Sequence, residues 1–140
     1  MFDRNLIGKT SGPETFEITP EAVAQFMEAT GDPAAHKEPR DPDYVPLTFP
    51  TTFRIANPSL GLDGSKLQLI HGEQEYQYAR PLRVGERLTC TSRIADIQEK
   101  VGRSGAMTFI ISEIKGCDNQ GELVFTGRST LIVRTKKAEE

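Results

Sequence analysis

The sequence predicts one α+β domain, in which a helix-rich first third is followed by a curved antiparallel sheet. Apolar residues recur at helical spacing over residues 20–30, whereas those after Lys66 alternate along extended segments. The region between these two patterns is rich in proline, which forbids long regular structure. Because 140 residues is the size of one domain, we expect residues 1–140 to form a single unit with a frayed tail at 135–140.

A helix is expected over residues 20–30. Thr19 can cap its first turn, and Pro20 suits the first helical position because its missing N–H needs no partner there. Glu21 complements the positive end of the helix dipole. Gly31 is a natural left-handed stop, so we expect the helix to end at Thr30.

Residues 31–58 hold six of the nine prolines and are expected to be irregular. Within them, residues 51–56 are free of proline and follow Pro50, so one or two helical turns can start there. Phe53 and Ile55 indicate that this short piece is buried. Residues 59–66 have the composition of a loop.

The remaining segments are expected to be strands. They cover residues 16–18, 67–79, 87–101, 106–117 and 123–133. Gly72 interrupts the second of these, and a change of parity near residues 93–96 suggests a bulge in the third. The fourth is apolar on both faces around Ile110. Short turns link the last three strands, which predicts an antiparallel meander.

Composition excludes several classes of protein. There are 17 Lys and Arg against 20 Asp and Glu, and no stretch concentrates enough of the cations to neutralise a row of phosphates, so we expect no nucleic-acid partner. The two cysteines, Cys90 and Cys117, are too few for a disulfide framework or a zinc site and are expected to be small core residues. No signal peptide or membrane-length apolar run is visible, so we expect a cytoplasmic protein with no membrane partner and no metal.

Two histidines are the candidates for chemistry, because no glycine-rich phosphate loop and no Gly-x-Ser-x-Gly elbow is present. His36 follows Asp32 by four residues, and a carboxylate beside an imidazole can share the work of adding or removing water. The alternative is that Asp32 only turns the chain and His36 is an exposed loop residue. His71 has apolar neighbours that favour a buried, hydrogen-bonded side chain, and Gly72 beside it permits close approach of a ligand.

Two further groups of charged residues allow two interpretations each. Glu73 and Glu75 lie on the same face of an expected strand. They are either a catalytic pair of carboxylates or part of a solvated surface, and the solvated surface is the commoner role. Arg80, Arg83 and Arg87 form a positive cluster near a turn. This cluster is either a solvated edge or a site for a phosphate of coenzyme A or of a phosphopantetheine arm.

Five short segments together resemble the MaoC-like dehydratases, most closely their N-terminal, FAS1-like dehydratase domain. These segments are Gly31-Asp32-Pro33, Pro46-Leu47-Thr48-Phe49-Pro50-Thr51-Thr52, His71-Gly72-Glu73-Gln74-Glu75-Tyr76, Arg80-Pro81-Leu82 and Gly85-Glu86-Arg87-Leu88. The resemblance spans residues 6–133. It implies a hot-dog fold, with a curved antiparallel sheet wrapped around a central helix. It also implies reversible hydration of 2-enoyl thioesters to (R)-3-hydroxyacyl thioesters, with no cofactor.

The family places its catalytic Asp and His in a Gly-Asp-x-Asn-Pro-x-His pattern after the first helix. Gly31 and Asp32 match its start, but Ala34 and Ala35 stand where Asn and Pro are expected. His36 therefore follows Asp32 by four residues instead of five, which can displace the imidazole by about 3 Å. N-terminal members of the family often keep the fold, lose the His and hold the acyl chain beside a catalytic partner.

The resemblance leads to a first hypothesis, that the chain is a subunit of an (R)-specific dehydratase that binds the acyl thioester next to a catalytic hot-dog partner. The alternative is a self-sufficient homodimeric hydratase, in which Asp32 and His36 activate water and an N–H near Thr51 polarises the thioester carbonyl. A hot-dog thioesterase is a weaker alternative, because residues 50–56 carry no acid. The expected substrate is an acyl-CoA or acyl-ACP thioester, and the expected partner is a second hot-dog subunit in a homodimer or heterodimer. The expected binding residues are Thr48, Phe49, Thr51, Phe53, His71, Gln74, Arg80, Arg83 and Arg87.

Overall fold

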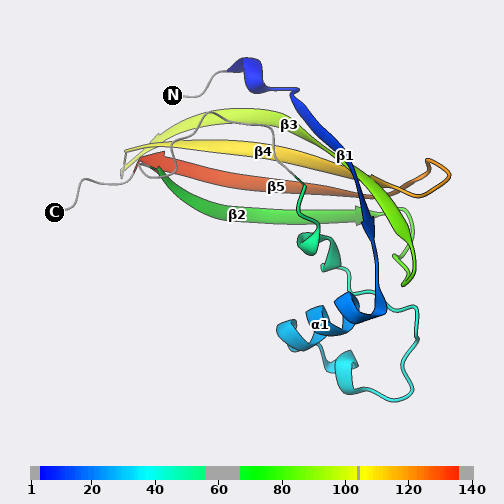
Figure 1. Ribbon diagram of the computed structural model, residues 1–140. Helices are drawn as coiled ribbons and strands as arrows, with labels where there is room; N and C mark the ends of the chain where they lie inside the picture. The colour runs from blue at the N-terminus through cyan, green and yellow to red at the C-terminus, as the bar shows by residue number, and fades with distance from the viewer. Residues whose placement is uncertain (1–3, 56–66, 104, 136–140) are drawn as a thin grey trace.

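The computed structural model describes residues 4–55, 67–103 and 105–135, and its main element is a five-stranded antiparallel sheet (Figure 1). The strands lie in the order β1-β3-β4-β5-β2. Their bounds are Thr10–Glu17 for β1, Leu67–Tyr78 for β2, Arg87–Gly102 for β3, Gly105–Cys117 for β4 and Leu123–Thr135 for β5. One α-helix, α1 (Pro20–Thr30), is present among the described residues and lies beyond one end of the sheet (Figure 1). The expected α+β class and the β3-β4-β5 meander are confirmed.

Helix α1 has the bounds and the caps that the sequence predicts. The Thr19 hydroxyl accepts a hydrogen bond from the Ala22 N–H at 3.1 Å. Gly31 ends the helix in the left-handed conformation, with φ at 70°. Just past this stop, the Asp32 N–H donates to the Met27 carbonyl at 2.9 Å, which fixes the direction in which the chain leaves the helix.

The helical turns expected over residues 51–56 take a different form. A 3₁₀ turn, η3 (Phe49–Thr52), is present, and residues 53–55 are not helical. The hydroxyls of Thr51 and Thr52 donate to the carbonyls three residues before them, at 2.8 and 2.9 Å, so they compete with a continuing helix for these acceptors. The rest of this expected helix, the loop over 59–66 and the tail from 136 onward lie outside the described residues.

Bulges adjust the faces of three strands. The predicted bulge in β3 lies between Ile94 and Asp96, and because it reverses the parity of the strand, both Ile94 and Ile97 are buried. A second bulge lies at Gly72 in β2, where the sequence predicts an interruption. Strand β1 is longer than expected because a register shift accommodates Pro13.

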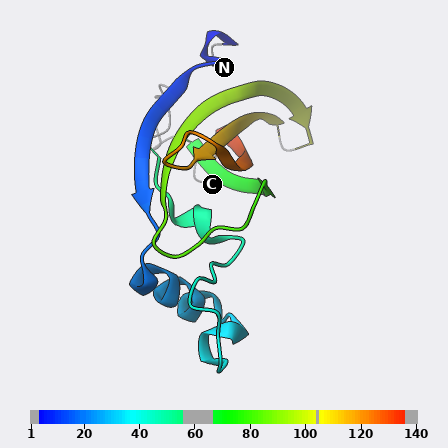
Figure 2. The same cartoon turned by 90° about the vertical axis from the view of Figure 1, so that its right-hand side faces the viewer.

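The core forms two apolar clusters on the inner face of the sheet, which is strongly curved in profile (Figure 2). One cluster joins α1 and η3 to the sheet end nearest the helix, and it includes Met27, Phe49, Phe53 and Phe125. The second lies toward the other end, around Ile110. Neither α1 nor any 3₁₀ turn in the described part of the chain has the length and apolarity of a membrane-spanning helix. Residues 45–55 of the irregular segment that follows α1 are held against the sheet end nearest the helix, because Val45, Phe49, Phe53 and Ile55 belong to the first cluster.

Candidate functional site

Asp32 lies directly after α1 and its carboxylate is held at both oxygens. It is the N-cap of the 3₁₀ turn η2 (Pro33–His36), where Oδ1 accepts the Ala34 N–H at 3.0 Å. The Tyr44 hydroxyl donates to Oδ2 at 3.2 Å. Burial raises the pKa of the Tyr44 phenol, and the charge of Asp32 raises it further. Tyr44 therefore remains a hydrogen-bond donor to this carboxylate at neutral pH.

His36, at the end of η2, points toward α1. Its Nε2 lies 3.2 Å from Oε2 of Glu28, and its side chain is 78% exposed. Both oxygens of Asp32 are bonded to other groups, Ala34 and Tyr44. The predicted Asp32–His36 pair is not joined by a hydrogen bond, although both residues line one hollow of about 130 Å³ between α1 and η2.

Four predicted binding residues lie on or beside η3, and they separate into two kinds. Phe49 and Phe53 are buried, with Phe53 stacked on Phe16 at 4.8 Å between ring centroids. Thr48 and Thr51 are exposed next to them. The turn therefore presents hydroxyl groups at the surface of an aromatic cluster.

His71 and Gln74 lie on β2, the edge strand of the sheet, and share its inner face with Tyr76 and Tyr78. We call these four residues the inner stripe. His71 is exposed, which corrects the prediction of a buried histidine, because β2 is the last strand of the sheet that the described residues form. Its Nε2 lies 3.1 Å from the Glu73 carbonyl, and Gln74 donates to the Arg128 carbonyl at 3.3 Å. The structure thus brings His71 and Gln74 onto one face of β2, and neither lines the hollow that Asp32 lines.

The three predicted arginines differ in their ion pairs. Arg80 is paired with both Glu86 and Asp118, and the hydrogen bond with Glu86 raises the pKa of its guanidinium. Arg83 and Arg87 are exposed, and neither forms an ion pair with another described residue. Only these two are free to bind an anion.

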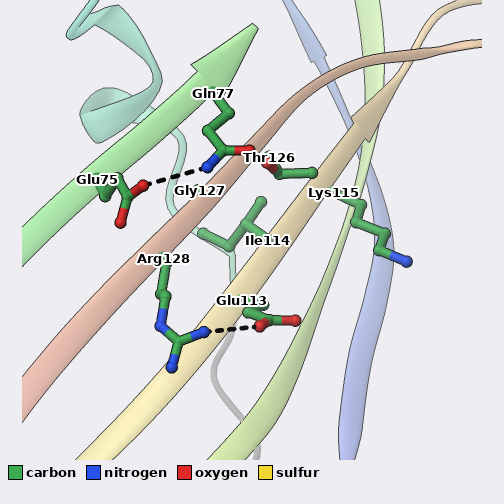
Figure 3. Close-up of a pocket in the computed structure, with 8 residues that line it drawn as sticks. All are labelled: Glu75, Gln77, Glu113, Ile114, Lys115, Thr126, Gly127 and Arg128. Atoms are coloured by element: carbon green, nitrogen blue, oxygen red, sulfur yellow. Dashed lines mark hydrogen bonds and ion pairs between the residues drawn. The ribbon is translucent and has the colours of Figure 1, made fainter. Parts of the chain in front are cut away.

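A second hollow, of about 210 Å³, lies over β2, β4 and β5 (Figure 3). In it, Glu113 bonds to Arg128 at 3.4 Å and also to Arg93 at 2.9 Å. Glu75 accepts the side-chain amide of Gln77, and Lys115 extends away from the other residues (Figure 3). Because its carboxylates are already paired or hydrogen-bonded, we assign this hollow no chemistry. The solvated role expected for Glu75 agrees with its exposure.

Residues 5–127 match the family described as "FAS1-like, dehydratase domain region". The chain belongs to this family. The UPF0336 protein SCO4636 of Streptomyces coelicolor is 36% identical to it, over 99% of this chain and 97% of the relative. The chain is thus similar to this relative over almost the full length of both proteins.

Two solved structures share its fold. One is the HadBC (3R-hydroxyacyl-ACP dehydratase) complex of Mycobacterium tuberculosis, with a TM-score of 0.68, 20% identity and coverage of 91% of this chain and 96% of that chain. The other is the MaoC-like dehydratase of Rhodospirillum rubrum, with a TM-score of 0.63, 14% identity and coverage of 99% of both chains. The predicted hot-dog fold and the resemblance to MaoC-like dehydratases are confirmed.

Three residues beside the predicted site were missed by sequence reasoning: Tyr44, Tyr76 and Tyr78. The sequence does carry a signal for two of them, because Gln74, Tyr76 and Tyr78 alternate at period two and must share one strand face. Nothing local marks Tyr44, whose contact with Asp32 spans twelve residues. Its role in the site depends on the fold of the proline-rich segment.

Proposed function

We propose that this chain is one subunit of an (R)-specific 3-hydroxyacyl-thioester dehydratase, which is an enoyl-thioester hydratase in the reverse direction. In this proposal the chain binds the acyl thioester next to a catalytic hot-dog partner. The observation that carries it is the direction of His36, which faces Glu28 while Asp32 is bonded to Tyr44. Acid–base addition of water needs both catalytic groups within reach of one water molecule, so the separation favours a binding role for this chain.

The edge strand β2 supports a paired assembly. It is 12 residues long and contains no proline or lysine, and Leu69 and Ile70 are exposed along it. Such an edge, with unpaired backbone groups and apolar side chains, favours the addition of a strand from another chain. The opposite edge, β1, is only 8 residues long and contains Pro13, which has no backbone N–H to donate to another strand. We therefore expect the partner subunit to join at β2.

Two features of the surface suit an acyl thioester. The aromatic cluster around Phe49 and Phe53 offers an apolar wall for the acyl chain, and the exposed Thr48 and Thr51 lie beside it. Arg83 and Arg87 offer cations for the phosphates of a coenzyme A or carrier-protein arm. In this proposal Arg80 is a structural residue, because Glu86 and Asp118 already neutralise it.

One observation favours a second candidate, a self-sufficient homodimeric hydratase. Asp32 and His36 line the same hollow, and the side chain of His36 is exposed enough to turn toward the carboxylate. In that case Asp32 and His36 would together activate water, with both groups supplied by one chain.

Hydration of crotonyl-CoA distinguishes the two candidates. The purified chain is assayed alone and after co-expression with a hot-dog subunit that carries the full Gly-Asp-x-Asn-Pro-x-His pattern. Activity that requires the second subunit supports the proposal. Turnover by the chain alone that disappears in Asp32→Asn and in His36→Ala would overturn the proposal in favour of the self-sufficient enzyme.

A further inference from the structure

The inner stripe of β2 places a phenol at the border between the core and the open edge of the sheet. Tyr76 pairs with Gly127 of β5, and a Cβ atom on that glycine would lie 3.0 Å from Cε1 of Tyr76. The missing side chain lets the tyrosine ring lie against the backbone of β5. Tyr76 also contacts the rings of Tyr78 and Phe125, at 6.4 and 6.3 Å between centroids. Its ring is therefore fixed on three sides.

The hydroxyl of Tyr76 differs from the other polar groups of the inner stripe. His71 and Gln74 are bonded to carbonyls of Glu73 and Arg128, and Tyr78 donates to the carbonyl of Leu47. Within the described ranges 4–55, 67–103 and 105–135, the Tyr76 hydroxyl makes no hydrogen bond. It is not a fully buried atom either, because Ser92 Oγ is the buried side-chain atom in these ranges that lacks a partner. A tyrosine whose ring is half-buried and whose hydroxyl is open and unbonded presents a polar group at the border of an apolar surface, so this hydroxyl is available to a ligand.

The environment of Tyr76 makes it a donor over the whole physiological range. Burial raises its pKa to about 12, so the phenol keeps its proton. The side chains beside it are aromatic, which suits an apolar chain attached to the group that accepts the proton. An acyl thioester has both features, because its thioester carbonyl is attached to the acyl chain and further carbonyl oxygens lie in the amides of its arm.

We infer that the Tyr76 hydroxyl donates a hydrogen bond to a carbonyl oxygen of the acyl thioester, and that Tyr76 is a specificity-determining residue. This inference rests on the proposed function and adds to it a named contact on the edge strand. The contact selects ligands that present a carbonyl acceptor next to the aromatic end of the inner stripe. It requires no movement of Tyr76, because its ring is already held by Gly127, Tyr78 and Phe125.

Two ligands and two variants test the contact. Dissociation constants are measured by calorimetry for crotonyl-CoA and for S-butyl-CoA, a thioether that lacks the thioester carbonyl. The complete subunit pair is used, with the His of the partner's Gly-Asp-x-Asn-Pro-x-His pattern replaced by Ala so that crotonyl-CoA is not hydrated during the titration. Tyr76→Phe removes only the hydroxyl, and we expect it to weaken crotonyl-CoA by roughly 3- to 10-fold. Gln77→Ala is the control, because Gln77 lies on the opposite face of the same strand and we expect no loss. Thermal unfolding checks that both variants fold.

The affinities for the two ligands distinguish the possible contacts of the Tyr76 hydroxyl. A loss confined to crotonyl-CoA supports a contact with the thioester carbonyl, and an equal loss on both ligands supports a contact with an amide carbonyl of the arm. Unchanged binding of both ligands by a folded Tyr76→Phe protein overturns the inference and leaves the proposed function standing. If the unmodified pair binds neither ligand, the proposed function itself fails.

Discussion

The imidazole of His36 faces Glu28 of helix α1, with 3.2 Å between Nε2 and Oε2, and does not face Asp32. Both side chains of this pair are largely exposed, at 78% and 66%. Exposed pairs contribute little, because water screens the charges and ordering the side chains costs entropy. We expect His36→Ala to change the free energy of unfolding by less than about 1 kcal/mol, measured by urea denaturation. A loss well above this value would mean that the imidazole belongs to a buried network.

Substitution of Phe53 tests whether this residue sets the preference for acyl chain length. It stacks on Phe16 and also contacts Phe49, so Phe53→Ala is expected to cost about 3–5 kcal/mol of stability, measured by denaturation. Phe53→Leu keeps most of the volume and is the better variant for binding. We expect it to weaken a long-chain thioester more than crotonyl-CoA, by about 1–3 kcal/mol.

Calorimetry on the subunit pair with the inactivated catalytic partner measures this difference between ligands. Ile110→Val is the matched control, because it removes one methylene from the second cluster, away from the aromatic residues. Equal effects of Phe53→Leu on long and short thioesters would show that Phe53 supports the core and does not line the acyl site.

Gly116 is required by the packing of the core. A Cβ atom at this position would lie 2.1 Å from Cε1 of Phe125, so the buried ring or the backbone of β4 would have to shift. We therefore expect Gly116→Ala to cost about 1–3 kcal/mol, measured by chemical denaturation. Gly102→Ala is the control, because its Cβ would meet only the end of Met107, at 3.8 Å. Similar losses in the two variants would contradict the packing argument.

Asp118 links stability to pH. The backbone N–H groups of Glu122 and Gln120, together with Arg80, hold the pKa of this carboxyl below its usual range. A carboxyl with a lowered pKa in the folded state stabilises the protein above its unfolded pKa, and that contribution is lost as the pH falls through the folded value. We expect the melting temperature to fall as the pH drops below about 4.

The comparison variant for this prediction is Asp118→Asn. It should melt at a lower temperature at pH 7 and lose less stability on acidification than the unmodified chain, as followed by circular dichroism. Parallel acid profiles for the two proteins would show that Asp118 does not carry the effect.

Elements that are formed by interactions between neighbouring residues were predictable from the sequence, and the turn around Phe49 was less so. Helix α1 was predicted with its bounds because Thr19, Pro20 and Gly31 act within one turn of the chain. The bulge of β3 was predicted because it reverses the side-chain alternation between Ile94 and Ile97. The turns around Phe49 were less predictable, because the hydroxyls of Thr51 and Thr52 compete for carbonyls that a helix would use.

By itself, the sequence determined the α+β class, helix α1, the meander and, through its motifs, the dehydratase family. These depend on periodicity, on capping residues and on short segments, all of which are local. The direction of His36, the contact of Tyr44 with Asp32 and the packing of the Tyr76 ring against Gly127 were decided only by the tertiary structure. They depend on which side chains meet after α1, the proline-rich segment and the edge strand have packed. Residue spacing along the chain does not determine such long-range side-chain contacts, because small differences in a loop move a side chain by several ångströms.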